Sequence, residues 1–332
     1  MKIFENYKKS LKSTETEDWL DLRVVRPFSY LLALVFDKLG THPNTVTILS
    51  MIIGVASCWG YIHGSYFYEG REGLVFNVIA CLLLLAADIL DCTDGQLARI
   101  SGKRSKWGRI LDGLAGPVWF VPIYLVLVYR FYMHHSLEFA WFGIPDTEQN
   151  TLIATAVVLI LALVSGFWGM SGQQRLADYY IQIHLYMLKG EKGCELDTSE
   201  SQQQDYEALP SNCNPVWRMF QKSYINYTKM QEAATPRFQT LMQALKEKYG
   251  TASAMPAEIR ERLLKASRRI MPWNAMLTFN FRTGIFFVFC LLDLPAWNFV
   301  FEIVMLGLLT KWIVYTHERD CTKVYEAIRL NP

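Results

Sequence analysis

Long apolar stretches separated by short polar ones dominate the chain. A membrane-spanning helix needs about 20 mostly apolar residues, and six stretches approach that length. They are Thr45–Ile62, Gly73–Leu90, Leu111–Met133, Leu152–Met170, Ala275–Leu292 and Ala296–Tyr315. The pattern therefore predicts an all-α, polytopic membrane protein with six transmembrane helices.

Two segments outside these stretches carry their own patterns. The apolar run 26–36 is too short to cross a bilayer, and Pro27 suits a first helical turn, so we expect an N-terminal interfacial amphipathic helix there. Residues 171–273 mix helical patterns with a polar stretch, 197–212, that is typical of a linker. The expected parts are the N-terminus with the interfacial helix (1–40), four spans (41–170), a cytoplasmic helical insert (171–273), two spans (274–316) and a cytoplasmic tail (317–332).

Basic residues indicate which loops face the cytoplasm, because Lys and Arg are retained on that side. The loop between the second and third spans is rich in them, with Arg99, Lys103, Arg104, Lys106 and Arg109. The loops after the first and third spans together carry a single one, Arg71. We therefore expect an integral protein of the cytoplasmic (inner) membrane, with both termini, the loop near residue 100 and the insert in the cytoplasm.

Composition narrows the class of protein. Of the 332 residues 52% are hydrophobic and 19% are charged, which excludes a disordered chain. The net charge of +2 offers no basic field for a nucleic acid, so we expect no such partner. The seven cysteines are scattered and never spaced Cys-x-x-Cys, which argues against a disulfide framework and against a zinc site.

Four aspartates gather where the second span ends and the third begins. Asp88, Asp91 and Asp94 are three residues apart, so neighbouring side chains share a helix face, and Asp112 opens the third span. Carboxylates this close repel unless a cation lies between them, and ionisable residues at membrane depth usually serve function. The spacing predicts a site for Mg²⁺ or Mn²⁺ that faces the cytoplasm. The alternative is that these aspartates only cap helices at a hydrated boundary.

Small and basic residues separate the aspartates. Gly95, Ala98 and Gly108 permit close approach of a ligand, and Arg99 can bind a phosphate. Arg109 lies between Gly108 and Asp112, and we expect it to face the same region. Together with the acidic residues they predict a phosphate-bearing substrate that arrives from water or from lipid headgroups.

These residues resemble a known signature. The run Asp91-x-x-Asp94-Gly95-x-x-Ala98-Arg99, followed after eight residues by Gly108-x-x-x-Asp112, is similar to that of the CDP-alcohol phosphotransferase (CDP-alcohol phosphatidyltransferase) family. The tract from Thr41 to Thr47 resembles the Pro-Asn entry to that family's first helix. The resemblance implies transfer of a phosphatidyl group from CDP-diacylglycerol to a small alcohol with release of CMP, two Mg²⁺ or Mn²⁺ ions, and pairing as a homodimer.

The resemblance also assigns roles to residues. Asp91, Asp94 and Asp112 would hold the metal ions, and Asp112 is also a candidate catalytic residue. The cytidine and phosphate pocket would be lined by Gly95, Ala98 and Arg99, with Asn44 and Thr47 nearby. Gly108 belongs to the same motif.

One position departs from the family pattern. A further Asp normally follows four residues after Asp112, where this chain has Gly116 and then Pro117, and no acid follows until Glu138 on the far side of the membrane. Three interpretations stay open. Asp88 supplies the missing carboxylate as general base, the metals and Arg99 suffice, or the chain binds CDP-lipid and metal without turnover. A kink with close helix packing would explain Gly116 and Pro117 without any chemistry.

The acceptor alcohol is suggested by the available cations. Inositol, inositol phosphate or glycerol phosphate are favoured, and serine remains an alternative. Arg282, on the fifth span near the depth of the aspartates, needs a partner, either an Asp of the site or an anionic acceptor. A small-solute transporter is a further class, but its acids are expected at the midplane of the membrane and not at one interface.

Overall fold

The computed structural model describes residues 7, 15–16, 19–103, 105–194, 196–251 and 254–330. Every regular element in these ranges is helical, which confirms the all-α prediction. Contacts divide the chain into two compact units. Unit 1 comprises Met1–Met170 with Asn280–Met305, and unit 2 comprises Ser171–Phe279 with Leu306–Pro332.

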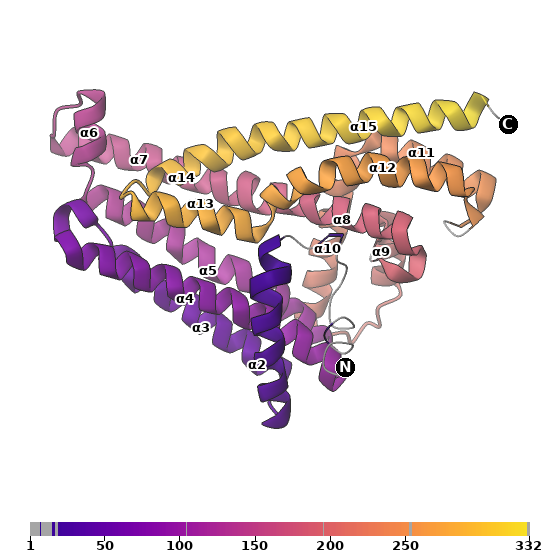
Figure 1. The fold of residues 1–332 in the computed structure, drawn as a ribbon, viewed down its shortest axis with the longest axis horizontal. Helices are drawn as coiled ribbons and strands as arrows, with labels where there is room; N and C mark the ends of the chain where they lie inside the picture. The colour runs from indigo at the N-terminus through magenta and orange to yellow at the C-terminus, as the bar shows by residue number, and fades with distance from the viewer. Residues whose placement is uncertain are drawn as a thin grey trace. The chain divides into compact units, whose positions relative to one another are not determined.

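Unit 1 is built around three long helices that run side by side (Figure 1). They are α3 (Pro43–Ile62), α4 (Tyr66–Ser101) and α5 (Lys106–Met133), and α3 packs against both of the others. A Cβ at Gly54 of α3 would lie 2.3 Å from the ring of Trp119 on α5, so glycine is required for this close approach. The unit is completed by α6 (Ser136–Phe142), α7 (Glu148–Val164), α13 (Phe279–Leu291) and α14 (Ala296–Phe301).

The spans follow the apolar pattern closely. Five helices of the described chain are long and apolar enough to cross a membrane, and a sixth is obtained if the bent pair Ala257–Leu277 and Phe279–Leu291 forms one span. The five are Pro43–Ile62, Gly70–Ser101, Ile110–Met133, Glu148–Lys189 and Ala296–Arg329. The fifth predicted span is the least regular, because α13 has 13 residues and is shorter than a single crossing requires. The prediction of a polytopic membrane protein is confirmed.

The predicted N-terminal helix is α2 (Arg26–Lys38), which packs across α4 (Figure 1). Its inner face is held by Ser29, whose hydroxyl donates to the Ile89 carbonyl oxygen at 2.9 Å. Phe28, Leu31 and Val35 are exposed at spacings of three and four residues, as on one face of an amphipathic helix. Its position at a membrane surface stays a prediction.

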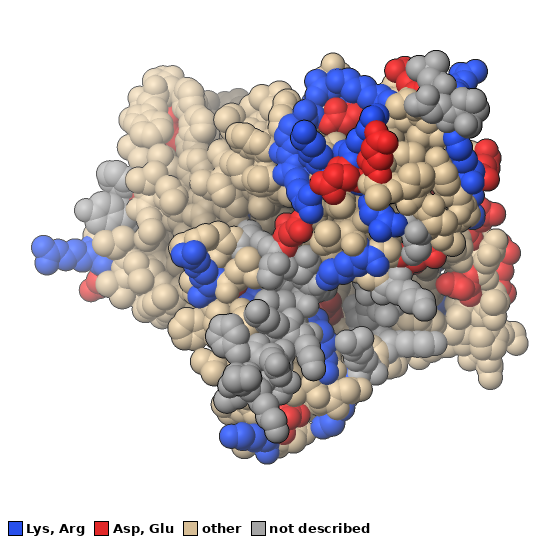
Figure 2. Space-filling view, turned by 45° about the vertical axis from the view of Figure 1, so that its right-hand side comes forward, with Lys and Arg blue, Asp and Glu red and all other residues tan. Residues whose placement is uncertain are grey.

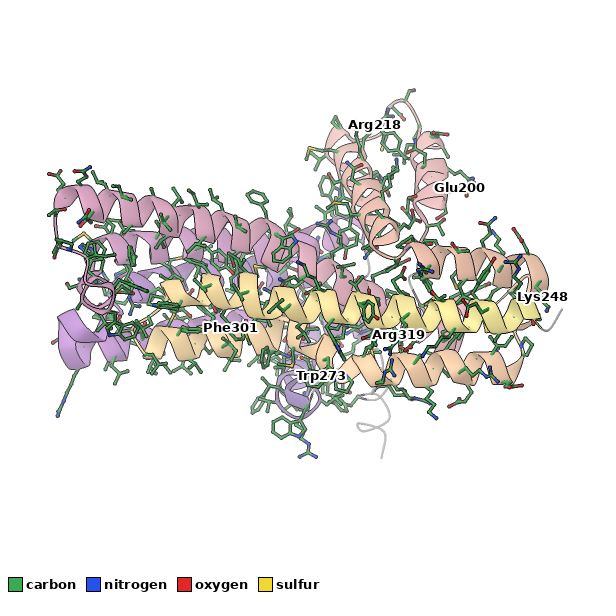
Figure 3. The ribbon with its side chains drawn as sticks, turned by 90° about the horizontal axis from the view of Figure 1, so that it is seen from above. Glu200, Arg218, Lys248, Trp273, Phe301 and Arg319 are labelled. Atoms are coloured by element: carbon green, nitrogen blue, oxygen red, sulfur yellow. The ribbon has the colours of Figure 1, made fainter. Side chains whose placement is uncertain are left out.

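Unit 2 is a set of amphipathic helices. It contains α8 (Gln174–Lys189), α9 (Ser199–Glu207), α10 (Pro215–Ala234), α11 (Pro236–Tyr249), α12 (Ala257–Asn274) and α15 (Gly307–Leu330). Helices α9 and α10, which carry the labelled Glu200 and Arg218, run side by side (Figure 3). Figure 2 shows basic and acidic side chains intermixed in the upper right of the view, and ion pairs such as Arg262 with Glu258 belong to this unit. Such a charged surface suits helices that lie in water.

Helix α9 occupies part of the stretch that the sequence predicts as a linker, and that prediction is wrong there. Its start is fixed by a reciprocal pair of hydrogen bonds between Thr198 and Ser201. Helix α11 begins in a related way, because the Glu318 carboxylate accepts from the backbone nitrogens of Arg237 at 2.7 Å and Phe238 at 3.2 Å. Side chains therefore supply the acceptors that the first turns of these short helices lack.

Candidate metal and nucleotide site

Three carboxylates from two helices meet in unit 1. Asp91 and Asp94 lie near the end of α4, and Asp112 lies near the start of α5. One oxygen from each of the three lies within 4.8 Å of the others. The connection between the helices is short because Gly102 ends α4 at φ +70°, which favours glycine, and Ser105 starts α5 by accepting from the Gly108 backbone nitrogen at 2.9 Å. We call Asp91, Asp94 and Asp112 the carboxylate triad.

The chemistry of the triad fits a hard divalent cation. All three donors are carboxylate oxygens, which Mg²⁺ and Mn²⁺ prefer. Asp91 Oδ1 is buried and has no hydrogen-bond partner in the described part of the chain, which is costly for a charged oxygen unless an ion satisfies it. Asp94 is buried whereas Asp112 is exposed, so the triad reaches from the interior to the surface, where a substrate can enter.

Helix α3 supports the triad from the side. Thr47 is 2% exposed, and its hydroxyl donates to Asp94 Oδ2, which fixes the orientation of that carboxylate. Asn44 lies one turn earlier, and a Cβ at Gly108 would come within 3.0 Å of its amide oxygen. Glycine at position 108 therefore lets the start of α5 approach α3. Both predicted residues of α3 thus lie beside the motif.

The phosphate-binding candidates follow the triad on α4. A Cβ at Gly95 would lie 3.7 and 3.8 Å from the two terminal nitrogens of Arg99, so the guanidinium folds back over that glycine. Ala98 and Arg99 are half-buried. This places a planar cation with several donors one turn beyond Asp94, a position suited to a phosphate group. Arg109 lies in α5, and its side chain is outside the described residues.

Two further charged residues interact electrostatically with Asp91 of the triad. Asp88 lies one turn before Asp91 on α4 and is 8% exposed. Arg26, at the start of α2, interacts electrostatically with Asp91, and its carbonyl oxygen accepts from the Gln96 side chain at 3.4 Å. The motif spacing gave no indication of Arg26 as a site residue. Its signal was an arginine directly before a proline at the start of an amphipathic helix.

Arg282 lies in a different constellation. It is 3% exposed on α13, its guanidinium lies 3.5 Å from the Glu302 carboxylate, and it donates to the Gly169 carbonyl oxygen at 3.2 Å. Glu302 also accepts from Ser165 and, at 2.8 Å, from the Tyr124 hydroxyl. The sequence offered a site aspartate or an anionic acceptor as the partner of Arg282, and the ion pair with Glu302 is a third arrangement that it did not consider.

Comparison with known proteins agrees with this geometry. Residues 40–171 match the family model of the CDP-alcohol phosphatidyltransferases, an interval that contains α3, α4, α5 and all three members of the triad. Members of that family transfer a phosphatidyl group from a CDP-alcohol to an alcohol and generally depend on divalent metal ions. Searches among curated proteins and among solved structures return no match. The resemblance seen in the motif is thereby confirmed for this segment, and the apolar helices and the family together indicate an integral membrane protein.

Proposed function

We propose that this protein transfers the phosphatidyl group of CDP-diacylglycerol to a small polar alcohol and releases CMP, at the cytoplasmic face of the inner membrane. The observation that carries the proposal is the carboxylate triad, with its buried and unpartnered Asp91 oxygen, inside the segment that matches the family. Mg²⁺ or Mn²⁺, with two ions expected from the family resemblance, would be held by Asp91, Asp94 and Asp112. The bound cations would neutralise the pyrophosphate of the donor and stabilise the leaving CMP.

The protein's own side chains position the donor. Thr47 holds the Asp94 carboxylate in its place in the triad, because its hydroxyl donates to that carboxylate. The Arg99 guanidinium can donate two parallel hydrogen bonds to a phosphate of the CDP moiety. Gly95 and Ala98 leave room for the cytidine beside it, with Asn44 at the edge. A preformed binding site of this kind would raise the rate of transfer by holding the donor phosphorus where the acceptor can attack it.

The transfer also requires a proton acceptor. A new bond forms between the acceptor oxygen and the phosphatidyl phosphorus, the bond from that phosphorus to the bridging oxygen breaks, and CMP departs with the electron pair. The hydroxyl proton must pass to a base, and position 116 offers none because it is glycine. We assign this role to Asp88, which lies one turn before Asp91 on the same helix. The alternative is that the phosphate of a phosphorylated acceptor takes the proton.

The basic residues near the site suggest which alcohol is the acceptor. The basic loop that follows Arg99 favours an acceptor that carries a phosphate, so inositol phosphate and glycerol phosphate come first, followed by inositol. A homodimer is expected from the resemblance alone. Arg282 is left out of the proposed acceptor site because its charge is already compensated by Glu302.

The test is CMP release by purified protein supplied with CDP-diacylglycerol, Mg²⁺ or Mn²⁺ and a panel of alcohols. We expect release with at least one acceptor, and we expect Asp91→Asn to abolish it because the substitution removes a charge from the triad. Asp37→Asn is the matched control, since this aspartate is exposed on α2. Retained binding of CDP-lipid without release of CMP with any acceptor would refute the proposed enzymatic activity. It would support a non-catalytic CDP-lipid and metal-binding protein, which the glycine at position 116 favours.

A further inference from the structure

A cavity lies in unit 1 at the end of α5 that is remote from the triad. It has a volume of about 570 Å³ and is lined by residues of α5, α6, α7 and α14. Phe131 of its wall is 19 positions after Asp112 on α5, which corresponds to about 28 Å along the helix. The cavity is therefore separate from the metal and nucleotide site. Its volume is in the range typical of small-molecule sites.

The walls of the cavity are mainly apolar. Ile153 and Val157 of α7 and Phe139 of α6 are among the residues that line it. Phe142 and Trp297 stack with ring centroids 6.1 Å apart and an interplanar angle of 18°. Such walls suit an aliphatic chain, because its transfer from water buries apolar surface.

One acidic side chain interrupts these walls. Glu138 of α6 lines the cavity and is 7% exposed, and its Oε2 atom has no hydrogen-bond partner among the described residues. The neighbouring basic side chains have partners elsewhere. Arg130 forms a buried ion pair with Asp293, and His135 Nε2 lies 3.1 Å from Asp146 Oδ1. Within the described part of the chain, the Glu138 carboxylate thus meets the apolar space without an ion pair of its own.

The electrostatics of this carboxyl group match that isolation. Burial, aided by nearby Asp293, raises the pKa of Glu138 to about 7, whereas a hydrogen bond from its own backbone N–H and the neighbouring His135 and Arg130 oppose the shift. At and above neutral pH the group ionises inside an apolar cavity, where a negative charge is unfavourable unless a cation or donor meets it. A ligand that has both a positive charge and an apolar chain would pair with the Glu138 carboxylate and also cover the apolar walls.

We propose that this cavity binds an amphiphile that carries a protonated primary amine, with the ammonium group on the Glu138 carboxylate and the aliphatic chain along α7 and Trp297. An ammonium group supplies three donors and a charge opposite to that of Glu138. A fatty acid would place two carboxyl groups together, and a long-chain alcohol would leave the negative charge uncompensated. The charge of the cavity therefore selects the amine among amphiphiles of equal length.

The experiment measures equilibrium binding of radiolabelled dodecylamine at pH 8 to the full-length protein in phosphatidylcholine nanodiscs, with empty nanodiscs subtracted. Dodecanol and dodecanoate serve as chain-matched competitors. We expect saturable binding of one amine per chain and at least tenfold weaker competition by dodecanol. Glu138→Gln should weaken amine binding at least tenfold, because a charge-assisted hydrogen bond is lost.

Three further variants separate recognition from misfolding. Glu138→Asp keeps the charge and should keep the preference for amine over alcohol. Ala154→Phe fills the cavity from α7 and should abolish binding, because Ala154 lines its wall. Glu148→Gln, at an exposed acid at the start of α7, should bind like wild type. Equal amine binding by wild type and Glu138→Gln, or dodecanol binding as tight as dodecylamine, would overturn the proposal.

Discussion

Restoring an aspartate at position 116 tests how the protein handles the acceptor proton. Gly116 lies four residues after Asp112 on α5, one helical turn further along the same face. A Cβ placed there would meet no described atom within 4 Å, so a side chain can start at this position without a clash at its Cβ. The substitution costs little helix stability, because glycine is itself the poorer helix former. Any change in rate therefore reports on chemistry and not on packing.

The size of the rate change that Gly116→Asp causes depends on whether Asp88 already accepts the proton. A positioned general base contributes about 10² to 10⁴ in rate, which corresponds to about 3 to 5 kcal/mol of barrier. Since we assign that role to Asp88, Gly116→Asp alone should raise the rate by less than about tenfold. In an Asp88→Asn background, where the base is missing, the same substitution should restore about 10² of the lost rate. The non-additivity of the two changes measures their shared role.

The assay is the initial rate of CMP release at saturating CDP-diacylglycerol, acceptor and metal, for the two single variants and the double variant. Gly113→Asp is the matched control. Its Cβ also meets open space, but it lies one residue after Asp112 and so about 100° around the helix. We expect no rescue from it. Equal effects of aspartate at positions 113 and 116 in the Asp88→Asn background would refute the prediction. A general base must reach the acceptor hydroxyl, and two positions on different faces of α5 cannot both place a carboxylate there.

Three other predictions concern hydrogen bonds and buried charge. Thr47→Val removes the donor to Asp94 and should raise the metal concentration for half-maximal activity about 10- to 100-fold, whereas Thr47→Ser should not; a titration of activity with Mg²⁺ checks this. Arg282→Leu leaves Glu302 buried without its cation and should cost about 3 to 5 kcal/mol of stability, seen as a lower unfolding midpoint, and adding Glu302→Leu should recover most of it. Because the pKa of Glu138 is raised from 4.5 to about 7, the folded state keeps a proton that the unfolded state releases, so stability should fall as pH rises through that window. Glu138→Gln should flatten this dependence and be more stable than wild type at pH 8 by on the order of 2 kcal/mol, as thermal unfolding at pH 5 and pH 8 would show.

The spans and the triad could be predicted because each depends on residues that are close in the sequence. The apolar stretch from residue 45 to 62 predicts a helix that the structure has as α3, Pro43–Ile62. Asp91 and Asp94 share a face through their three-residue spacing alone. Bringing Asp112 to them requires only a short turn, for which Gly102 and Ser105 are the local signals. No long-range information was needed for this part of the site.

Elements that depend on caps or on distant helices were harder to predict. The polarity of residues 197–212 suggested a linker, yet the bonds between Thr198 and Ser201 are enough to start α9. Arg26 reaches the triad because α2 packs across α4, a crossing fixed by contacts such as that of Ser29 with Ile89, 60 positions apart. The apolar pattern of α2 predicts which face is buried but not against which helix.

The buried charges of unit 1 show why such partners escape a sequence pattern. Arg130 pairs with Asp293, which is 163 positions further along the chain, and Tyr124 donates to Glu302 across 178 positions. Hydropathy describes the average environment of a residue, so an acid in a polar loop between two spans, such as Glu138, is expected to be hydrated. The fold instead covers it with α7 and α14, and its environment becomes that of a cavity. The local sequence predicts that this carboxyl group is hydrated, whereas the tertiary structure buries it. A buried carboxylate destabilises the fold unless a cation or a hydrogen-bond donor pairs with it, and this is the physical reason to look for a ligand at Glu138.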